Sequence, residues 1–289
     1  MYRQNWDDIR FVLAVADTGS VNAAASRLGV THATVLRRVG MFEERHGQPV
    51  FQKLSTGYRV LPAAEPILLA ARKVEDSILA VNRAFLEADQ SMAGEVRITS
   101  TDSLCKFVLP PVIRKIAGRF PQLTLILLGG NSRRDFFRLG ADIAVRPAIV
   151  NEAGMTGREV SRFGISLYRS DASEDRWLGF EGALRNSRVG IWMDEHVRSD
   201  KIIHRADSFV FLQELVAAGM GKAILPRFIG DTDPRLIRMD DEMPGFSAPL
   251  WIATVEEMSR NARFRAVQDV LAAEIDVALR PFRGVENEW

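Results

Sequence analysis

A short basic stretch near the N-terminus holds the side chains best suited to bind another molecule. Five of them fall on one side of a predicted helix: Thr31, His32, Thr34, Arg37 and Arg38. Arginine and histidine can donate hydrogen bonds to base edges and phosphates in the major groove of DNA, and a small neighbour such as Ala33 allows a close approach. This surface predicts binding to nucleic acid.

Two short helices joined by a tight turn would position that surface. An alanine-rich helix ends at Leu28, and Gly29 can adopt the left-handed backbone conformation that the turn needs. Thr31 is a candidate N-cap for the second helix, which is predicted to run to about His46. The core-facing side of that helix is apolar and comprises Val35, Val39 and Phe42. The pattern predicts a helix-turn-helix.

The flanking segments extend this motif. An amphipathic helix is predicted to open at Asp7, and Asn22 can cap the next helix. Two β-prone runs, residues 50–53 and 58–61, surround a Ser-Thr-Gly turn and predict a hairpin, which would be the wing of a winged helix. The hairpin carries two cations that would contact backbone phosphates: Lys53 and Arg59.

Residues 62–92 predict a single long helix with a heptad pattern. The apolar positions are Ala64, Ile67, Ala71, Val74, Ile78, Val81, Phe85, Ala88 and Met92. A sustained heptad marks a seam for a partner helix. The alternative is a helix that lies on its own domain. A seam of about four heptads between two domains favours pairing between chains, so we expect a homodimer with two recognition helices for two half-sites.

From Gly94 onward, strands and helices alternate. The predicted strands are 95–100, 123–128, 141–145, 188–192, 223–225 and 249–255. The predicted helices are about 104–119, 133–139, 209–218 and 260–279. This order predicts a parallel α/β sheet in two subdomains, with chain crossings near 166–170 and 248–252.

Polar residues follow the carboxyl ends of these strands, where such sheets bind ligands. They are Ser100, Thr101, Asp102, Ser103, Asn131, Arg146 and Ser208. Hydroxyl groups and helix N–H groups suit a small carboxylate, which Arg146 could neutralise. Asp102 disfavours a strongly anionic ligand or selects a donor group. For any one of these residues, ordinary helix capping or surface solvation is the alternative.

Composition limits the remaining functions. The net charge of the 289 residues is +1, whereas residues 1–60 contain eight Lys or Arg and five Asp or Glu, a local excess where the helix-turn-helix is predicted. One cysteine, Cys105, excludes an internal disulfide and has no resolving partner for a redox switch, so buried packing is favoured. The N-terminus lacks an apolar signal core and no run has the length of a membrane span, so we expect a cytoplasmic protein.

Catalytic and cofactor motifs are missing from the sequence. Gly219-Met220-Gly221 begins like a dinucleotide fingerprint, but it follows a predicted helix and Ile224 replaces the third glycine. The adjacent residues Asp194, Glu195 and His196 are poorly spaced to share a metal ion, and a solvated loop is favoured. We therefore predict that the chain is not an enzyme and binds neither a metal nor a cofactor.

Residues 6–65 resemble the DNA-binding domain of LysR-type transcriptional regulators. The stretches that carry the resemblance are 6–11, 19–20, 50–53 and 61–65. The resemblance implies that bases are contacted by His32, Ala33, Leu36 and Arg37, whereas Arg38 would contact a phosphate. For each of these residues a solvated helix face is the alternative, or for Leu36 simple core packing. Thr31-His32-Ala33 and Leu36 depart from the usual residues of the family, which leaves the operator sequence open.

Residues 93–289 are similar to the co-inducer domain of the same family, a two-subdomain fold like that of periplasmic solute-binding proteins. The stretches that carry this similarity are 94–98, 109–111, 120–121, 141–147 and 216–226. The expected parts are an all-α winged helix-turn-helix (1–61), a linker helix (62–92), and an effector domain (93–289) with subdomain I at about 93–167 and 250–289 and subdomain II at about 168–249.

The resemblance implies a sequence-specific DNA-binding regulator whose activity depends on a small-molecule effector held between the two subdomains. It also implies a linker dimer that extends to a tetramer, and RNA polymerase is a further expected partner. The alternative function is an α/β enzyme or solute-binding protein with an accessory helical domain. A solute-binding protein would need an export signal and an enzyme would need a catalytic motif, so the regulator is favoured.

Overall fold

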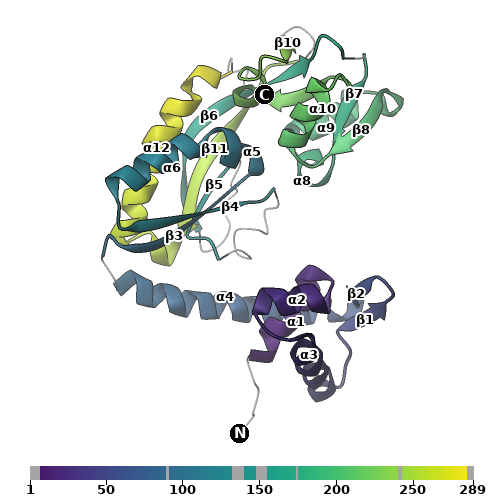
Figure 1. Ribbon diagram of the computed structural model, residues 1–289, viewed down its shortest axis with the longest axis vertical. Helices are drawn as coiled ribbons and strands as arrows, with labels where there is room; N and C mark the ends of the chain where they lie inside the picture. The colour runs from purple at the N-terminus through teal and green to yellow at the C-terminus, as the bar shows by residue number, and fades with distance from the viewer. Residues whose placement is uncertain are drawn as a thin grey trace. The chain divides into compact units, whose positions relative to one another are not determined.

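The computed structural model describes residues 7–88, 91–131, 140–147, 155–173, 175–239 and 243–284. The chain forms two compact units, residues 1–83 and 84–289 (Figure 1). The predicted boundaries of the three parts and of the two subdomains stay predictions, since the second unit is compact as a whole.

Three helices form the body of the first unit: α1 (Asp7–Thr18), α2 (Val21–Leu28) and α3 (His32–His46). The Thr31 side chain accepts a hydrogen bond from the Thr34 N–H and so caps α3, as predicted. The prediction that Asn22 caps α2 is wrong, because Asn22 already lies inside that helix. Ser20 has the extended backbone of an N-cap and its side chain accepts from the Ala23 N–H.

The wing is an antiparallel hairpin of β1 (Phe51–Leu54) and β2 (Gly57–Val60). It lies directly against the turn between α1 and α2, because the Tyr58 N–H donates a 2.8 Å hydrogen bond to the Gly19 carbonyl. A Cβ atom at position 57 would lie 2.4 Å from that same oxygen, and the backbone φ there is +138°. Only glycine fits this contact without moving the backbone.

A long helix follows the wing. After a short 3-10 turn, η1 (Pro62–Ala64), helix α4 runs over Glu65–Ala88. Ala64, Leu68 and Ala71 are buried in the core of the first unit, whereas Ile78 and Val81 are 51% and 58% exposed. The start of the predicted seam therefore packs on its own domain, whereas the side chains of Ile78 and Val81 in the later part are exposed to solvent. The prediction that the helix reaches Met92 is wrong, because Met92 lies in the non-helical segment that precedes strand β3 at Gly94.

The second unit is built on a mixed sheet. β3 (Gly94–Ser100) lies between β4 (Leu123–Gly129) and β5 (Ile143–Pro147), and both pairings are parallel, as the alternating pattern predicts. β11 (Phe246–Val255) is antiparallel to β5 and to β6 (Met155–Arg169), so the prediction of a wholly parallel sheet is wrong. Among the described residues, the strand order is β10-β6-β11-β5-β3-β4, with β9 also paired to β6.

The remaining strands lie toward the other end of this unit. β9 (Ala223–Pro226) and β10 (Ile237–Met239) pair with the end of β6, while β7 (Trp177–Phe180) and β8 (Ile202–Ala206) form a separate parallel pair. Figure 1 shows β6 and β11 reaching from the part that holds β3, β4 and β5 toward the part that holds β7 and β8.

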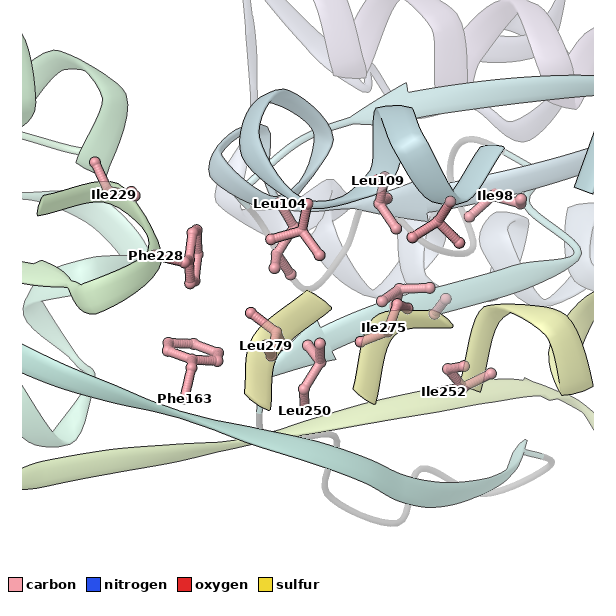
Figure 2. Packing of buried hydrophobic residues seen from close by; sticks show 14 of the residues in the cluster. Ile98, Leu104, Leu109, Phe163, Phe228, Ile229, Leu250, Ile252, Ile275 and Leu279 are labelled. Carbon is pink, nitrogen blue, oxygen red and sulfur yellow. The ribbon is translucent and has the colours of Figure 1, made fainter. Parts of the chain in front are cut away.

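Helices cover both parts of the unit. The helices are α5 (Asp102–Phe107), α6 (Leu109–Arg119), α8 (Gly182–Arg185), α9 (Arg188–His196), α10 (Phe209–Ala217), α11 (Arg227–Gly230) and α12 (Ala262–Leu279). Three further 3-10 turns are η2 (Ser199–Lys201), η3 (Glu256–Met258) and η4 (Arg280–Phe282). Buried apolar side chains from α5, α6, β11 and α12 form one core with Phe163 of β6, whose ring meets Phe228 of α11 edge to face at 5.1 Å (Figure 2).

Several predicted elements of this unit need correction. The predicted helix 104–119 is broken at Val108, because Pro110 and Pro111 lack the N–H groups that a continuous helix would use and instead open α6. The predicted strand 188–192 is helix α9, which Ser187 caps and whose buried Val189 and Met193 are four residues apart. Strands β6, β7, β8 and β10 were not predicted, and the predicted helix 133–139 lies outside the described residues.

Candidate nucleic-acid interface and effector site

The exposed side of α3 carries the residues predicted to meet bases. His32, Ala33 and Arg37 are exposed, and Leu36 is 39% exposed. Core packing, the alternative for Leu36, is therefore excluded, since Val35 fills that role. The Arg37 guanidinium contacts only the Met41 sulfur, at 3.8 Å, among the hydrogen bonds between described residues. This side of the helix presents a cation, an imidazole and an apolar side chain to solvent.

Thr34 and Arg38 also have structural contacts within the unit. The Thr34 hydroxyl lies 2.9 Å from the Thr31 hydroxyl and belongs to the helix cap. Arg38 is half-buried, and its Nη1 donates a 2.8 Å hydrogen bond to Asp8, which also accepts 3.1 Å from Arg45. Asp8 therefore joins α1 to two positions of α3. Contact between Arg38 and a DNA phosphate stays a prediction.

The wing presents both of its predicted cations. Lys53 and Arg59 are exposed on the two strands, and Lys53 is paired with Tyr58 in the hairpin register. The Tyr58 ring packs edge to face on Phe51, with 6.3 Å between the ring centroids. Lys53 therefore lies on the same face of the hairpin as Tyr58 and Phe51, whereas Arg59 lies on the opposite face, and both cations are exposed to solvent.

A buried carboxylate that the sequence did not single out lies at the end of α1. Asp17 accepts a 2.9 Å hydrogen bond from Arg27 of α2 and a 2.7 Å hydrogen bond from Arg72 of α4. These partners are 10 and 55 residues away along the chain. A spacing of that kind follows no local periodicity, so the contact becomes visible only in the folded unit.

In the second unit, the structure brings together three of the predicted effector residues. The Ser208 hydroxyl, at the N-cap of α10, donates to the Asp102 carboxylate at the start of α5. The Asn131 side chain accepts from the Asp102 N–H at 3.3 Å and donates to the Asp207 carbonyl at 3.1 Å. These contacts connect the ends of β3 and β4 to α10. We call Asp102, Asn131 and Ser208 the α5–α10 contact.

The other four predicted effector residues are held by hydrogen bonds of their own. Ser100 is fully buried and its hydroxyl donates to the Val145 carbonyl at 2.7 Å. The Thr101 hydroxyl accepts from the Leu104 N–H and lies 3.2 Å from the Ser103 hydroxyl. Arg146 is 7% exposed and its Nη2 donates to the Thr99 hydroxyl at 3.0 Å. Ser100 therefore stabilises the sheet, and Arg146 supplies a buried positive charge.

The pKa of the Cys105 thiol depends on burial and on two nearby charges of this region. Burial and the Asp102 carboxylate raise the pKa of the Cys105 thiol from 9.0 to about 11, although the Arg146 charge acts in the opposite direction. Asp102 and Arg146 thus both act on the half-buried thiol. A carboxylate and a guanidinium at one site suit a small ligand that carries both a donor group and an anionic group.

Other classes of site receive no support within the described ranges. None of the helices there is long and apolar enough to cross a membrane. His, Cys, Asp and Glu side chains do not gather there in threes that could hold a metal ion. Asp194 of α9, which the sequence already disfavours as a metal ligand, forms an ion pair with Arg185 of α8.

A winged helix-turn-helix together with a separate α/β unit that has a polar contact at its strand ends is the architecture of a DNA-binding transcription regulator with an effector-binding domain. Residues 6–65 match the model of the bacterial regulatory helix-turn-helix protein of the lysR family, and residues 89–276 match the LysR substrate binding domain. The chain belongs to the LysR family of transcriptional regulators.

Relatives extend over most of the chain. The Mau operon transcriptional activator of Paracoccus denitrificans is 28% identical over 228 residues, which are 78% of this chain and 80% of that protein. The HTH-type transcriptional regulator CrgA of Neisseria meningitidis is 22% identical, covering 94% of this chain and 98% of its own. A solved full-length OxyR variant from Pseudomonas aeruginosa covers 100% of both chains with a TM-score of 0.62 at 18% identity, which shows the shared fold.

Proposed function

We propose that α3 reads operator bases through His32, Ala33, Leu36 and Arg37 while the wing binds phosphates through Lys53 and Arg59. The exposure of these side chains, opposite a buried face of the same helix, is the observation that carries the proposal. The arginine suits a guanine edge and the leucine suits a thymine methyl group. Arg38 acts mainly with Asp8 to hold α3 against α1.

We infer that the protein is a homodimer through α4. Ile78 and Val81 belong to the heptad seam and are exposed in the single chain, so they are available to a second α4. Pairing of these helices would present two recognition helices to two half-sites. A tetramer would follow from a second pairing of such dimers.

We infer that the effector binds at the α5–α10 contact, between the two predicted subdomains. Its chemical class is a small carboxylate with a hydroxyl or amino group: Arg146 would balance the carboxylate and Asp102 would accept from the donor group. A ligand that prefers one arrangement of α5 and α10 would shift the geometry of the dimer on DNA. The protein would work in the cytoplasm, where operator DNA lies, with RNA polymerase as a partner.

The test of the DNA-reading surface is a gel shift on the DNA that flanks the gene, with Arg37→Gln. We expect specific affinity to fall about 10- to 100-fold, because one base contact is lost, with thermal unfolding unchanged. Lys106→Gln is the matched control, since it removes the same charge from an exposed position of the other unit. Unchanged specific affinity in Arg37→Gln would remove this residue from the reading surface.

A further inference from the structure

A glutamate near the end of the recognition helix is bonded to the first strand of the wing. One carboxylate oxygen of Glu43, Oε1, accepts a 2.7 Å hydrogen bond from the Val50 N–H and a 3.1 Å hydrogen bond from the Phe51 N–H. Glu43 lies on α3, whereas Phe51 begins β1. The contact therefore joins the helix that is proposed to read bases to the strand that carries Lys53.

The two N–H groups depend on this side chain for their acceptor. Within the described residues β1 and β2 form a sheet of two strands, so the outer edge of β1 has no neighbouring strand. Val50 and Phe51 are both buried, which makes water a poor substitute acceptor. A carboxylate that accepts two backbone N–H groups makes charge-assisted bonds, which are stronger than neutral ones. Glu43 thus takes the place of a third strand at the base of the wing.

The loop between α3 and β1 is also held by the backbone of Glu43. Gly47 ends α3 in the left-handed conformation, with a φ of +67°. The next N–H, that of Gln48, donates to the Glu43 carbonyl at 3.3 Å, and Pro49 has a fixed φ angle. Both the carbonyl and the side chain of Glu43 therefore hold the segment that leads into β1.

A second attachment holds the other strand of the wing. The Tyr58 N–H donates to the Gly19 carbonyl at 2.8 Å, and Arg59 is the next residue on β2. Lys53 lies on β1, the strand that Glu43 holds. The two attachments therefore hold different strands, and each strand carries one of the two exposed cations.

We propose that Glu43 is a positioning residue for DNA binding, which sets the place of Lys53 relative to the base-reading side of α3. It acts through β1 and not through a contact of its own with DNA. The inference rests on the proposed phosphate contact of Lys53. Since a carboxylate repels phosphates, loss of its charge alone should strengthen DNA binding, whereas loss of positioning should weaken it. The sign of the effect separates the two roles.

Salt titrations of DNA affinity test the proposal, with the full chain and the DNA that flanks the gene. Glu43→Asp keeps the charge but shortens the side chain by one methylene group, and Glu43→Ala removes the acceptor. We expect both to weaken binding about threefold to tenfold and to reduce the slope of log affinity against log salt by about 1 per protomer, as for one lost phosphate contact. Glu43→Gln keeps an acceptor oxygen and should retain the slope of the parent protein.

A neighbouring glutamate and a double-mutant cycle provide the controls. Glu44→Ala removes an equal charge from the next, exposed position of α3 and should leave binding unchanged or slightly stronger. In the Glu43→Asp protein, Lys53→Gln should cause no further loss of affinity. Arg59→Gln should cause its full loss there, because its strand is held by Gly19.

Two results would overturn the role of Glu43 and leave the phosphate contact of Lys53 standing. One is affinity like that of the parent protein in Glu43→Asp and Glu43→Ala, and the other is full additivity between Glu43→Asp and Lys53→Gln. An unchanged salt slope in Lys53→Gln alone would overturn the proposed phosphate contact and the role of Glu43 together. Thermal unfolding of each variant identifies misfolding. If Glu43→Ala unfolds, the milder Glu43→Asp decides the question.

Discussion

The Asp17 carboxylate accepts a 2.7 Å hydrogen bond from Arg72, and this contact joins the first helix of the DNA-binding unit to the linker helix. Arg27 of α2 donates to the other carboxylate oxygen at 2.9 Å. The Asp17 side chain is only 5% exposed, whereas the two arginine side chains are about 40% exposed. A nearly buried carboxylate therefore fixes the angle at which α4 leaves the helix-turn-helix.

Arg72→Gln should change which operators the protein prefers more than it changes stability. We expect the free energy of unfolding to fall by about 1 kcal/mol or less, because the Arg72 side chain is 41% exposed and its charge is partly screened by solvent. The loss of a fixed angle at α4 should broaden or shift the preferred distance between half-sites. Gel shifts on half-site pairs with varied spacers measure this effect.

Lys73→Gln is the control for that experiment, since Lys73 is the exposed neighbour of Arg72 on the same helix. It removes an equal charge without touching Asp17. An identical spacing preference in Arg72→Gln, Lys73→Gln and the parent protein would show that the Asp17–Arg72 contact only stabilises the unit.

A double change of Ile78 and Val81 to serine should weaken dimerisation. Both side chains are more than half exposed in the single chain and share the heptad seam, so a partner helix would bury them. We expect the dimer dissociation constant to rise at least 100-fold in sedimentation equilibrium. Leu69→Ser is the control, because Leu69 is 62% exposed but lies off the seam. A stable dimer in the double variant would place the dimer interface elsewhere.

The Asp102→Asn variant should bind effectors that carry a donor group more weakly than the parent protein does. The substitution keeps the size of the side chain but removes the charge that accepts from Ser208 and, in our proposal, from the ligand. Amino acids and hydroxy acids that raise the melting temperature of the parent protein should bind the variant at least tenfold more weakly. Asp200→Asn, an exposed carboxylate paired with Arg198, serves as the control. Equal affinity in both variants would contradict a role for Asp102 in binding.

Cys105 should react slowly with iodoacetamide near neutral pH. Because burial and Asp102 raise the pKa of its thiol to about 11, only about 0.1% is thiolate at pH 8, against about 10% for a pKa of 9.0. The rate should rise about tenfold per pH unit up to pH 11, and Asp102→Asn should accelerate it at any lower pH. The denatured chain provides the reference rate. Equal rates for native and denatured protein at pH 8 would contradict the raised pKa.

The sequence predicts the first unit almost residue by residue because its signals are local. Gly29 and Gly47 both have left-handed backbone conformations at the ends of helices, and Thr31 caps the helix that it precedes. The exception is the cap of α2, for which the sequence predicted Asn22, whereas the structure uses Ser20, two residues earlier. Local sequence identifies suitable caps, but the backbone conformation decides between them.

The second unit was harder to predict, because its two longest strands do not show a clear alternation of apolar and polar residues. β6 and β11 pair along ten positions and carry glycine, proline and a bulge, so their alternation is weak in the sequence. The segment around Val189 contains enough apolar residues for either a strand or a helix, and Ser187 settles it as a helix by capping. Tertiary packing decides whether such a segment forms a strand or a helix, and a short stretch of sequence carries no information about that packing.

Some residues of the candidate sites could likewise be predicted from the sequence, whereas others could not. Residues at strand ends, such as Asp102 and Asn131, could be selected from topology alone, since parallel strands end on the same side of a sheet. Ser100 was selected by the same rule, but its hydroxyl is used within the sheet. Asp17 could not be selected, because its role depends on Arg27 and Arg72, which are distant in the sequence.

The close contact between Gly19 and Gly57 limits which distances within the DNA-binding unit an effector can change. Because the wing hairpin is bonded to the turn before α2, with no room for a side chain between them, the wing cannot move relative to α3 without breaking that contact. If α3 and the wing bind DNA as proposed, the distance from the bases under α3 to the phosphates under the wing is therefore constant within each half-site. Operators selected under different effector conditions should share this internal layout and differ only in the separation of their halves.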